Sequence, residues 1–498
     1  MMRKSFLSFV LLLSAACSWA AGRVERPKLV VGFVVDQMRW DYLYHYYEDY
    51  RSDGLRRLLD EGFSYANTLI NYVPTVTAIG HASIYTGSTP ALHGIAGNGF
   101  LEKGRYKYCV GDESVKGVGT ESRAGQMSPR NCWANGLGDQ IRLATNFEGH
   151  AWGVALKDRA AILPAGHAAD AAYWYDNSVG GFVSSTYYMD ALPKWVENFN
   201  KQHKHKEGYD PKLQADGVTL TLKMAQALIE NEPVGRDNVT DLLAISISTT
   251  DAMSHQWGTR GEKNKEVFLQ LDRDLAWFLK LLDERFGRGN YLFFLTADHG
   301  GAHNPNYMIG HKLPAGGWNG KALLKRVNDQ LAQRFGHERL ALDIFGDQFY
   351  LNHARIDSLG LDLGLVKEEV CQRILENDTL LYAIDCEKAG SATLPYRIRE
   401  QIVNGYNRLR SGDIFIVPKS QMFSFAFSQD YVGTTHSEWN PYDAHIPFVL
   451  MGWHVKHGET NLETHITDIA PTICAMLHIQ APNSCIGDAR EEHLNIEY

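Results

Sequence analysis

The sequence predicts an α/β fold in which helices cover both faces of a mainly parallel sheet. Several short segments are continuously apolar, whereas a strand with one face in water would alternate apolar and polar residues. Helical patterns separate these segments, and such alternation is typical of parallel sheets with helical connections. Chemically reactive residues follow most of the segments, at the sheet edge where α/β proteins bind their ligands.

The predicted strands are identified by their apolar runs and by the residues that come next. Residues 29–35 lead into Asp36, and residues 152–156 lead into Lys157. The remaining runs are residues 242–247, which precede Asp251, residues 291–295, which precede Asp298 and His299, and residues 445–451, a further buried strand. The clearest helical patterns lie at residues 265–282 and 467–477.

Two stretches depart from this alternation and are predicted to be insertions that cap the site. They are residues 160–215, rich in Ala, Tyr and Trp, and residues 319–432, a mixed region between two blocks of motifs. A smaller insertion is expected near residues 101–135. The α/β core then consists of residues 21–159, 216–318 and 433–498, and a chain of 498 residues is long enough for such accessory regions.

The first residues have the pattern of a secretion signal. Arg3 and Lys4 form a short positive region, residues 6–16 are apolar, and small residues at Ser18 and Ala20 suit cleavage. The apolar run is too short to cross a bilayer. We therefore predict a signal peptide at residues 1–20, an exported mature protein and no membrane span, with lipoprotein processing at Cys17 as the alternative.

The charge and the absence of nucleotide motifs exclude several classes of partner. The formal charge of −9 becomes −11 once Arg3 and Lys4 are removed with the signal. An acidic protein without a basic cluster is not expected to bind nucleic acid or an anionic membrane. No P-loop and no dinucleotide fingerprint occurs. We expect a monomer that acts on a small molecule.

Six cysteines remain after signal removal, and their spacing suggests three local disulfide bridges. The suggested pairs are Cys109–Cys132, Cys371–Cys386 and Cys474–Cys485. Disulfides would suit an oxidising compartment, although six cysteines allow fifteen pairings. A zinc site made of cysteines is disfavoured because no C-x-x-C motif occurs.

Aspartates and histidines near the predicted strand ends suit a metal ion. Asp251 and His255 are four residues apart, which places both side chains on one face of a helix. The other candidates are Asp36, Asp298, His299 and His436. Each residue alone has an ordinary explanation, such as a helix cap or a surface histidine. Together they form a mixed oxygen and nitrogen set that suits Zn²⁺.

The order of these motifs carries a family resemblance. The phrases are Val34-Val35-Asp36-Gln37-Met38-Arg39, Thr77-Ala78-Ile79-Gly80-His81, Tyr85-Thr86-Gly87-Ser88-Thr89-Pro90 with His93-Gly94, Lys157-Asp158-Arg159, Asp251 through His255-Gln256-Trp257-Gly258, and Thr296-Ala297-Asp298-His299-Gly300. In this order they resemble the alkaline phosphatase superfamily, most closely the threonine-nucleophile alkaline phosphatases secreted by Gram-negative bacteria. The resemblance implies an alkaline-phosphatase-like fold and a periplasmic or secreted location.

The resemblance also implies two zinc ions per chain and a threonine nucleophile. Asp251, His255 and His436 would hold the first ion. The second ion would be held by Asp36, Asp298, His299 and the oxygen of Thr77. Contact with Zn²⁺ lowers the pKa of a hydroxyl, so Thr77 is expected to attack phosphorus and form a phospho-threonine.

Three further residues are expected to bind the phosphate group. Lys157 and Arg159 are two apart on a predicted strand, so both side chains would project to one face. In the resembled phosphatases such a pair binds the nonbridging oxygens, and two cations favour a dianionic monoester. Asn98 matches an asparagine that donates to a phosphate oxygen. The ordinary alternatives are an exposed basic pair and a turn residue beside glycine.

Hydrolysis of phosphate monoesters is therefore the predicted function, with alternatives. A nucleotide pyrophosphatase/phosphodiesterase would use the same two-metal core, but Lys157 and Arg159 argue against a monoanionic diester. An inactive zinc-binding exported protein is the alternative of another class. A sulfatase would need a C/S-x-P-x-R phrase, which the residues around Thr77 lack. A cofactor-independent phosphoglycerate mutase is cytosolic and uses serine.

Other polar residues near the motifs are not assigned to the site. Thr75 and Ser83 are rival hydroxyls, but only Thr77 aligns with the family nucleophile. A structural role is expected for His81. No ligand role is expected for His303, His311 or His445.

Overall fold

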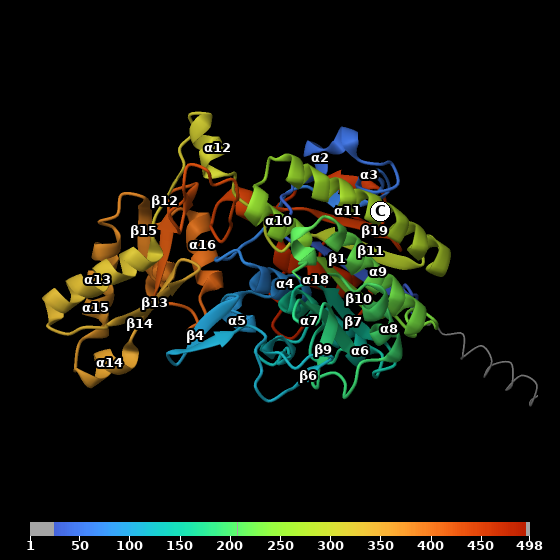
Figure 1. The fold of residues 1–498 in the computed structure, drawn as a ribbon, viewed down its shortest axis with the longest axis horizontal. Helices are drawn as coiled ribbons and strands as arrows, with labels where there is room; N and C mark the ends of the chain where they lie inside the picture. The colour runs from blue at the N-terminus through green and yellow to red at the C-terminus, as the bar shows by residue number, and fades with distance from the viewer. Residues whose placement is uncertain (1–23, 207, 495–498) are drawn as a thin grey trace, which may run out of the picture.

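The computed structural model describes residues 24–206 and 208–494, which form one large sheet and a smaller lobe beside it (Figure 1). The predicted signal peptide, residues 1–20, lies outside the described residues. Within the described ranges, no helix is long and apolar enough to span a membrane.

The large sheet has ten strands, and its five central strands are parallel, which confirms the predicted fold class. In spatial order the strands are β20 (Gly458–Thr460), β2 (Phe63–Tyr65), β19 (Phe448–Gly452), β11 (Tyr291–Thr296), β1 (Leu29–Val35), β10 (Asp241–Ile247), β7 (Ala151–Ala155), β8 (Ala171–Asp176), β9 (Gly181–Ser185) and β6 (Gly117–Val118). All residues of β1, β10 and β11 are buried, because helices cover both faces.

Two layers of helices provide this cover. One layer contains α4 (Thr77–Thr86), α6 (Leu137–Ala144), α7 (Asp158–Ala165) and α18 (Ile469–Met476). The other contains α3 (Leu55–Glu61), α8 (Lys194–Gln202), α9 (Asp216–Asn231), α10 (Thr249–Trp257) and α11 (Glu262–Phe286). The helices predicted at residues 265–282 and 467–477 correspond to α11 and α18.

Short elements complete this part of the chain. They are α2 (Tyr42–His45), α5 (Pro90–His93), α12 (Pro305–Gly310), α17 (Pro441–Ala444), the hairpin of β4 (Gly99–Glu102) and β5 (Arg105–Tyr108), and a small sheet of β18 (His445–Ile446), β3 (Thr68–Leu69) and β21 (Thr464–His465). The strand predicted at residues 445–451 is confirmed for its second part, which forms β19, whereas residues 445–446 form the separate strand β18. Pro447 lies between β18 and β19, and proline has no N–H for a ladder hydrogen bond.

The parallel register brings three strand ends to one place. Val35 at the end of β1 pairs with Ile247 at the end of β10, and Val34 pairs with Thr296 at the end of β11. The residues that follow these strands therefore emerge side by side at the carboxyl edge of the sheet. Strand β1 lies between β10 and β11, so it pairs with both of the strands whose ends share this edge.

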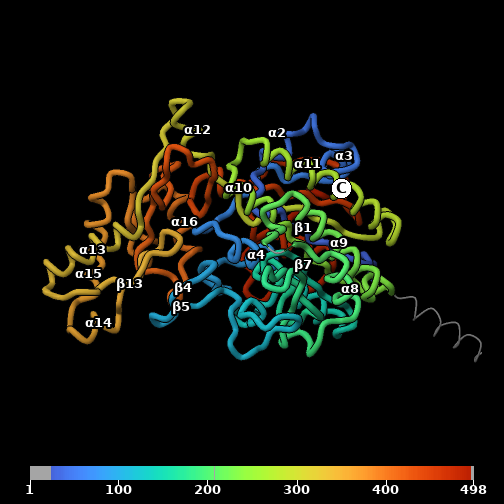
Figure 2. Tube along the Cα trace, in the orientation of Figure 1, coloured from blue at the N-terminus to red at the C-terminus, as the bar shows by residue number. Residues whose placement is uncertain are grey.

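The predicted insertion at residues 319–432 contains a separate antiparallel sheet with its own hydrophobic core. Its elements are β13 (Ala341–Phe345), β14 (Gln348–Leu351), β16 (Ile414–Pro418) and β15 (Leu380–Asp385), with α13 (Gly320–Phe335), α14 (His353–Ser358), α15 (Leu363–Ile374) and α16 (Tyr396–Gly405). The chain enters and leaves this region through β12 (Gly316–Gly317) and β17 (Met422–Phe423), which pair with each other. The tube in Figure 2 shows these elements gathered in one lobe beside the large sheet.

The other predicted insertion, residues 160–215, is wrong for its middle part. Strands β8 and β9 lie in this segment, and both belong to the large sheet rather than to a cap. Their residues are all buried, including Tyr173, Trp174 and Tyr175. The aromatic residues that made the segment look unlike the core in fact pack within it.

The predicted disulfide bridges are absent. All six cysteines of the described part are free thiols: Cys109, Cys132, Cys371, Cys386, Cys474 and Cys485. Burial raises the pKa of Cys109 and Cys132, which keeps both thiols protonated. Spacing along the chain was a weak guide because a bridge also requires the two Cβ atoms to face each other.

The smaller lobe contains one carboxyl whose burial has a testable cost. Asp347, in the turn between β13 and β14, is 4% exposed, and burial raises its pKa to about 7. Its ionised form is therefore disfavoured in the folded protein but not in the unfolded chain. The folded state loses stability as pH rises from the unfolded pKa, about 4, to the folded value near 7.

We predict that Asp347→Asn stabilises the protein increasingly between about pH 4 and pH 7, with a constant gain of at most about 4 kcal/mol above that range. Urea unfolding at a series of pH values measures this gain. Asp357→Asn, at an exposed position of α14, is the control and should give no such pH dependence. A gain for Asp347→Asn that is the same at every pH would contradict the prediction.

Candidate metal centre and active site

The six predicted metal ligands meet at the carboxyl edge of the large sheet. Asp36 directly follows β1, and Asp298 and His299 follow β11. Asp251 and His255 lie on α10, which begins directly beyond β10, and His436 lies in the loop before α17. These side chains come from segments up to four hundred residues apart, and they form two adjacent groups.

The first group consists of Asp251, His255 and His436. Oδ1 of Asp251 lies 3.1 Å from Nε2 of His255 and 3.6 Å from Nε2 of His436. The ligand atoms of the three residues all lie within 4.8 Å of one another, as atoms around one ion would. The four-residue spacing on α10 places Asp251 and His255 together as predicted.

The second group consists of Asp36, Asp298 and His299. Nε2 of His299 lies 3.6 Å from Oδ1 of Asp36 and 3.5 Å from Oδ2 of Asp298. Each of these three atoms is buried without a hydrogen-bond partner in the described protein. Buried polar atoms of this kind require compensation, and a cation between them would contact all three. The donor set therefore fits a metal ion.

The two groups share a border. Asp251 also lies within 4.8 Å of Asp36 and His299, measured between ligand atoms. The rings of His299 and His436 are stacked, with centroids 3.6 Å apart. Two cations held by these groups would therefore be close neighbours, as in enzymes that use paired metal ions.

Backbone carbonyls fix the orientation of the three histidines. Nδ1 donates to a carbonyl oxygen in each: His255 to Thr434 at 2.9 Å, His436 to Thr75 at 2.7 Å, and His299 to Gly300 at 2.9 Å. Because a carbonyl can only accept, Nδ1 carries the proton, and Nε2 faces the groups. Burial acts to lower the pKa of His255, but Asp251 outweighs it and raises that pKa, so a lone pair at Nε2 is favoured in His299 and His436 rather than in His255. Burial lowers the pKa of His299 and His436, which keeps them neutral.

The neighbouring carboxylates repel one another, and the pKa values of Asp36 and Asp251 shift in opposite directions. Burial, Asp251 and Asp298 together raise the pKa of Asp36 well above its usual value, although Lys157 opposes this. Burial also acts to raise the pKa of Asp251, but His255 and Lys157 outweigh it and bring the pKa well below its usual value. Nζ of Lys157 donates to Asp36 at 2.6 Å and to Asp251 at 2.5 Å.

Thr77 is the first residue of α4 and is 1% exposed. The N-terminus of a helix attracts negative charge because its backbone N–H groups point outward. Asn98 lies beside it, since Oδ1 of Asn98 accepts from the N–H of Ala78 at 2.9 Å. The side-chain amide nitrogen of Asn98 has no acceptor among the described residues and remains available to a ligand.

The predicted geometry of Lys157 and Arg159 is wrong. Strand β7 ends at Ala155, Lys157 precedes α7, and Arg159 is the second residue of that helix. The two side chains therefore do not share one face of a strand. Lys157 contacts the carboxylates. Arg159 instead donates to the hydroxyl of Tyr108 at 3.0 Å, and its buried Nε has no partner within residues 24–206 and 208–494.

Sequence reasoning missed two residues that position this centre. Tyr108, on β5, donates to Asp158 at 2.6 Å and accepts from Arg159, so the hairpin of β4 and β5 orients the arginine. Gln37 donates to aspartates of both groups. Gln37 directly follows a predicted ligand, which was a usable signal, but no sequence feature linked Tyr108 to Arg159.

The residues that were left unassigned do have other partners. Thr75 donates to the carbonyl of Glu438 at 3.0 Å, and Ser83 contacts His93 at 3.1 Å. His81 joins the carbonyl of Thr77 to Ser246 and is a structural neighbour of the centre. The contacts of the other three are His303 with Arg39, His311 with the carbonyl of Tyr307, and His445 with the carbonyl of Ala66.

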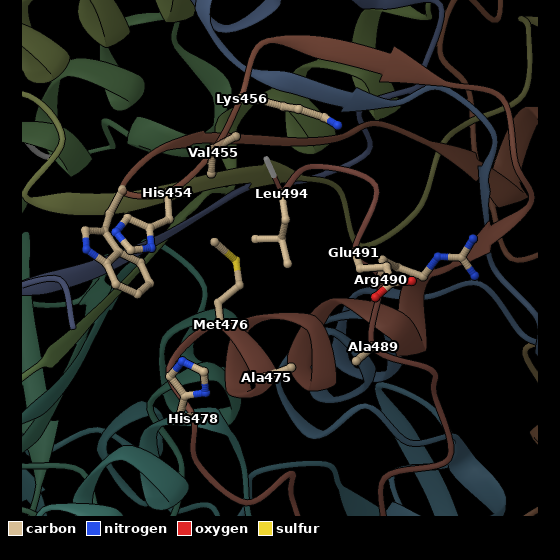
Figure 3. A pocket seen from close by; sticks show the side chains of 11 residues that line it. His454, Val455, Lys456, Ala475, Met476, His478, Ala489, Arg490, Glu491 and Leu494 are labelled. Carbon is tan, nitrogen blue, oxygen red and sulfur yellow. The ribbon is translucent and has the colours of Figure 1, made fainter. Parts of the chain in front are cut away.

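A separate cavity of about 660 Å³ lies at the C-terminal end of the described chain (Figure 3). Its lining includes Trp453, Met476, Arg490 and Leu494. It contains none of the predicted site residues, so it is distinct from the candidate active site.

The fold and the paired ligand groups together define a metal-dependent α/β enzyme. The chain belongs to the type I phosphodiesterase / nucleotide pyrophosphatase family, because the sequence model of that family matches residues 30–433. The resemblance inferred from the motifs is thereby confirmed.

Relatives match nearly the whole chain. A Myroides odoratus protein named calcium-transporting ATPase is 43% identical, with 98% of this chain and 97% of the relative covered. Alkaline phosphatase PafA of Elizabethkingia meningoseptica is 41% identical, with 97% and 98% covered. Alkaline phosphatase PhoV of Synechococcus elongatus is 41% identical, with 93% and 92% covered.

Solved structures of PafA have the same architecture. The wild-type enzyme matches with a TM-score of 0.91 at 41% identity, covering 95% of this chain and 100% of that one. A variant substituted at a threonine, an asparagine, a lysine and an arginine also matches with a TM-score of 0.91, at 39% identity and the same coverage.

We predict that removing bound metal destabilises the protein, because Asp36, Asp251 and Asp298 then repel one another without compensation. A chelator should lower the melting temperature of the parent by about 5 °C. Asp36→Asn should lose less, because it removes one of the buried charges. Scanning calorimetry with and without chelator measures both shifts, and exposed Asp357→Asn should behave as the parent does. Equal chelator shifts in Asp36→Asn and the parent would contradict the prediction.

Proposed function

We propose that this protein is an alkaline phosphatase that hydrolyses phosphate monoesters to inorganic phosphate, with two zinc ions and a phospho-threonine intermediate. The observation that carries the proposal is the meeting of two adjacent ligand groups near the N-terminus of α4, which begins at Thr77. His436 contacts the carbonyl of Thr75, and His81 of α4 contacts Asp298. The names of the PafA and PhoV relatives support the activity. Hydrolysis of a phosphate bond is also common to these names and to that of the ATPase relative.

The donor sets support a definite division of the ligands. Asp251, His255 and His436 would hold one ion. Asp36, Asp298, His299 and the Thr77 oxygen would hold the other. When bound, the ions would supply positive charge that lowers the pKa of a coordinated hydroxyl and stabilises anionic oxygen.

The chain's own residues would act in two displacements. Oγ of Thr77 would attack phosphorus as its proton passes to solvent, and the ester oxygen would depart with the bonding electrons and take up a proton from solvent. A water molecule then attacks the phospho-threonine, which releases inorganic phosphate and restores the Thr77 hydroxyl. The N-terminal N–H groups of α4 favour the negative charge that gathers beside Thr77 in both steps.

Two donors support recognition of a phosphate group. They are the amide nitrogen of Asn98, which lies beside the start of α4, and Nε of Arg159, which is buried without a partner among the described residues. Lys157 would add a third contact, and a second positive charge, by turning part of its ammonium group from the carboxylates to the substrate. An arginine and a lysine together match the two negative charges of a monoester. The substituted PafA structure involves the same four residue types: threonine, asparagine, lysine and arginine.

A second candidate function is a nucleotide pyrophosphatase/phosphodiesterase. The name of the matching family contains both activities and favours this function, and the match covers residues 30–433. The inactive zinc-binding protein remains as the third possibility, and turnover of any ester would exclude it. Relative rates on p-nitrophenyl phosphate and bis-p-nitrophenyl phosphate separate the first two.

We also propose that the protein is exported as a monomer to the periplasm or the medium, after cleavage near Ala20. The positive residues Arg3 and Lys4 and the apolar stretch after them support this. N-terminal sequencing of the protein recovered from a periplasmic fraction tests the cleavage.

We predict that Thr77→Ala lowers kcat for p-nitrophenyl phosphate by about 10³-fold or more, because the nucleophile is lost. Zinc content, measured by elemental analysis, should remain close to that of the parent because six protein ligands are unchanged. Thr75→Ala is the matched control, since this hydroxyl donates only to Glu438 and Asp443. Activity of Thr77→Ala near the parent level would assign the nucleophile elsewhere.

We predict that Lys157→Ala combined with Arg159→Ala lowers kcat/KM on the monoester at least about 10-fold more than on the diester. The monoester presents an additional negative charge, so it loses more when both cations are removed. The diester assay is the internal control for misfolding. Equal losses on the two substrates would show that these cations do not set the substrate class.

A further inference from the structure

Gln37 has a conformation and an environment that its position does not explain. It follows Asp36 at the end of β1, is 1% exposed, and has φ of 61°. This left-handed region is occupied by few residues other than glycine, because the Cβ atom approaches the backbone. A glycine here would adopt the turn without strain, so the side chain of Gln37 must have a use that offsets the strain.

Gln37 donates to one aspartate of each ligand group. Its backbone N–H donates to Oδ1 of Asp298 at 3.1 Å, and its Nε2 donates to Oδ1 of Asp251 at 2.9 Å. Among the described residues these are buried contacts between segments more than two hundred residues apart. A single residue thus connects β11 and α10 through the carboxylates that would hold two different ions.

The contact with Asp251 is made at the oxygen that matters for the first group. Oδ1 is the atom that lies 3.1 Å from His255 and 3.6 Å from His436. The other oxygen, Oδ2, accepts from Lys157 at 2.5 Å. Gln37 and Lys157 therefore fix the rotation of the Asp251 carboxylate by holding one oxygen each.

The surroundings determine the orientation of the Gln37 amide. With Nε2 toward the Asp251 carboxylate, Oε1 is left buried without a partner. The reverse orientation would point a carbonyl oxygen at a carboxylate, which is repulsive. Gly301 provides the space, since a Cβ atom there would lie 3.0 Å from Cδ of Gln37.

From these contacts we propose that Gln37 is a positioning residue that sets the Asp251 carboxylate for the ion held with His255 and His436. The inference rests on the proposed function for the presence of that ion. The amide contact is specific to glutamine, whereas any residue but proline provides the backbone N–H to Asp298. The turn itself is held independently, because Thr250 donates to the carbonyl of Asp36 at 2.6 Å. Loss of the side chain therefore weakens only one of the two sites.

Substitution of Gln37 separates the two contacts. Gln37→Met keeps the side-chain size and removes the amide donor, and Gln37→Gly removes the side chain while permitting the positive φ. In both variants we expect one zinc ion to be bound about 10- to 100-fold more weakly and the second ion to be bound as in the parent. Competition between ZnCl₂-loaded protein and a chromogenic chelator measures both affinities without reference to turnover.

A matched control and a rescue experiment complete the test. Gln348→Met replaces another buried glutamine, whose amide donates to the carbonyl of Ala96 at 2.9 Å, and should keep both affinities. Excess zinc should restore most of the kcat of Gln37→Met, as expected for a positioning role. The metal-free forms of Gln37→Gly and the parent should melt within a few degrees of each other.

Two outcomes would overturn the proposal. One is unchanged affinity for both ions in Gln37→Met and Gln37→Gly. The other is equal weakening of both ions with a large drop in the melting temperature of the metal-free protein, which indicates a general structural role. The parent is measured in parallel, so that the proposed function is tested separately from the role of Gln37. A parent that binds two zinc ions and hydrolyses the monoester supports the proposed function, whatever the result for the Gln37 variants. A parent that binds no zinc overturns both.

Discussion

The structure depends on the burial of three carboxylates, Asp36, Asp251 and Asp298, at one edge of the large sheet. Their burial and mutual repulsion are unfavourable in the absence of cations, and Lys157, which donates to Asp36 and Asp251, offsets this cost only in part. The register of the central strands makes this clustering unavoidable, because three parallel strands end within one residue of each other. The fold thus concentrates negative charge at a site where bound metal ions would neutralise it.

The other residues of the centre are oriented so that cations would bind at fixed positions. Backbone carbonyls hold the histidines by Nδ1, so each Nε2 faces the carboxylates. These carbonyls belong to Thr75, Gly300 and Thr434, which lie outside the helices and strands. His299 and His436, which burial keeps neutral, add ligands without adding charge.

Much of this could be predicted from the sequence, and the errors have physical causes. The ligand residues could be predicted because continuous apolar runs identify buried parallel strands. A four-residue spacing, such as that of Asp251 and His255, also places two side chains on one face of any helix. Lys157 and Arg159 were misplaced because β7 ends at Ala155, before either residue, and the alternation of side chains along a strand does not continue past its end. Strands β8 and β9 were mistaken for a cap because their segment, rich in Ala, Tyr and Trp, did not show the alternation of strands and helices, whereas they are buried.

Under the proposed function, the metal ligands and the arginine that would recognise the substrate lie in different parts of the chain. The ligand groups lie at the ends of β1, β10 and β11, where the sheet allows little change. Arg159 instead depends on Tyr108, whose hairpin lies outside the large sheet and contacts the smaller lobe through the ion pair of Glu102 and Arg410. Changes in this hairpin can therefore move the arginine without disturbing the metal ligands. This separation provides a physical reason why one metal core could serve monoesterases and diesterases within the same family.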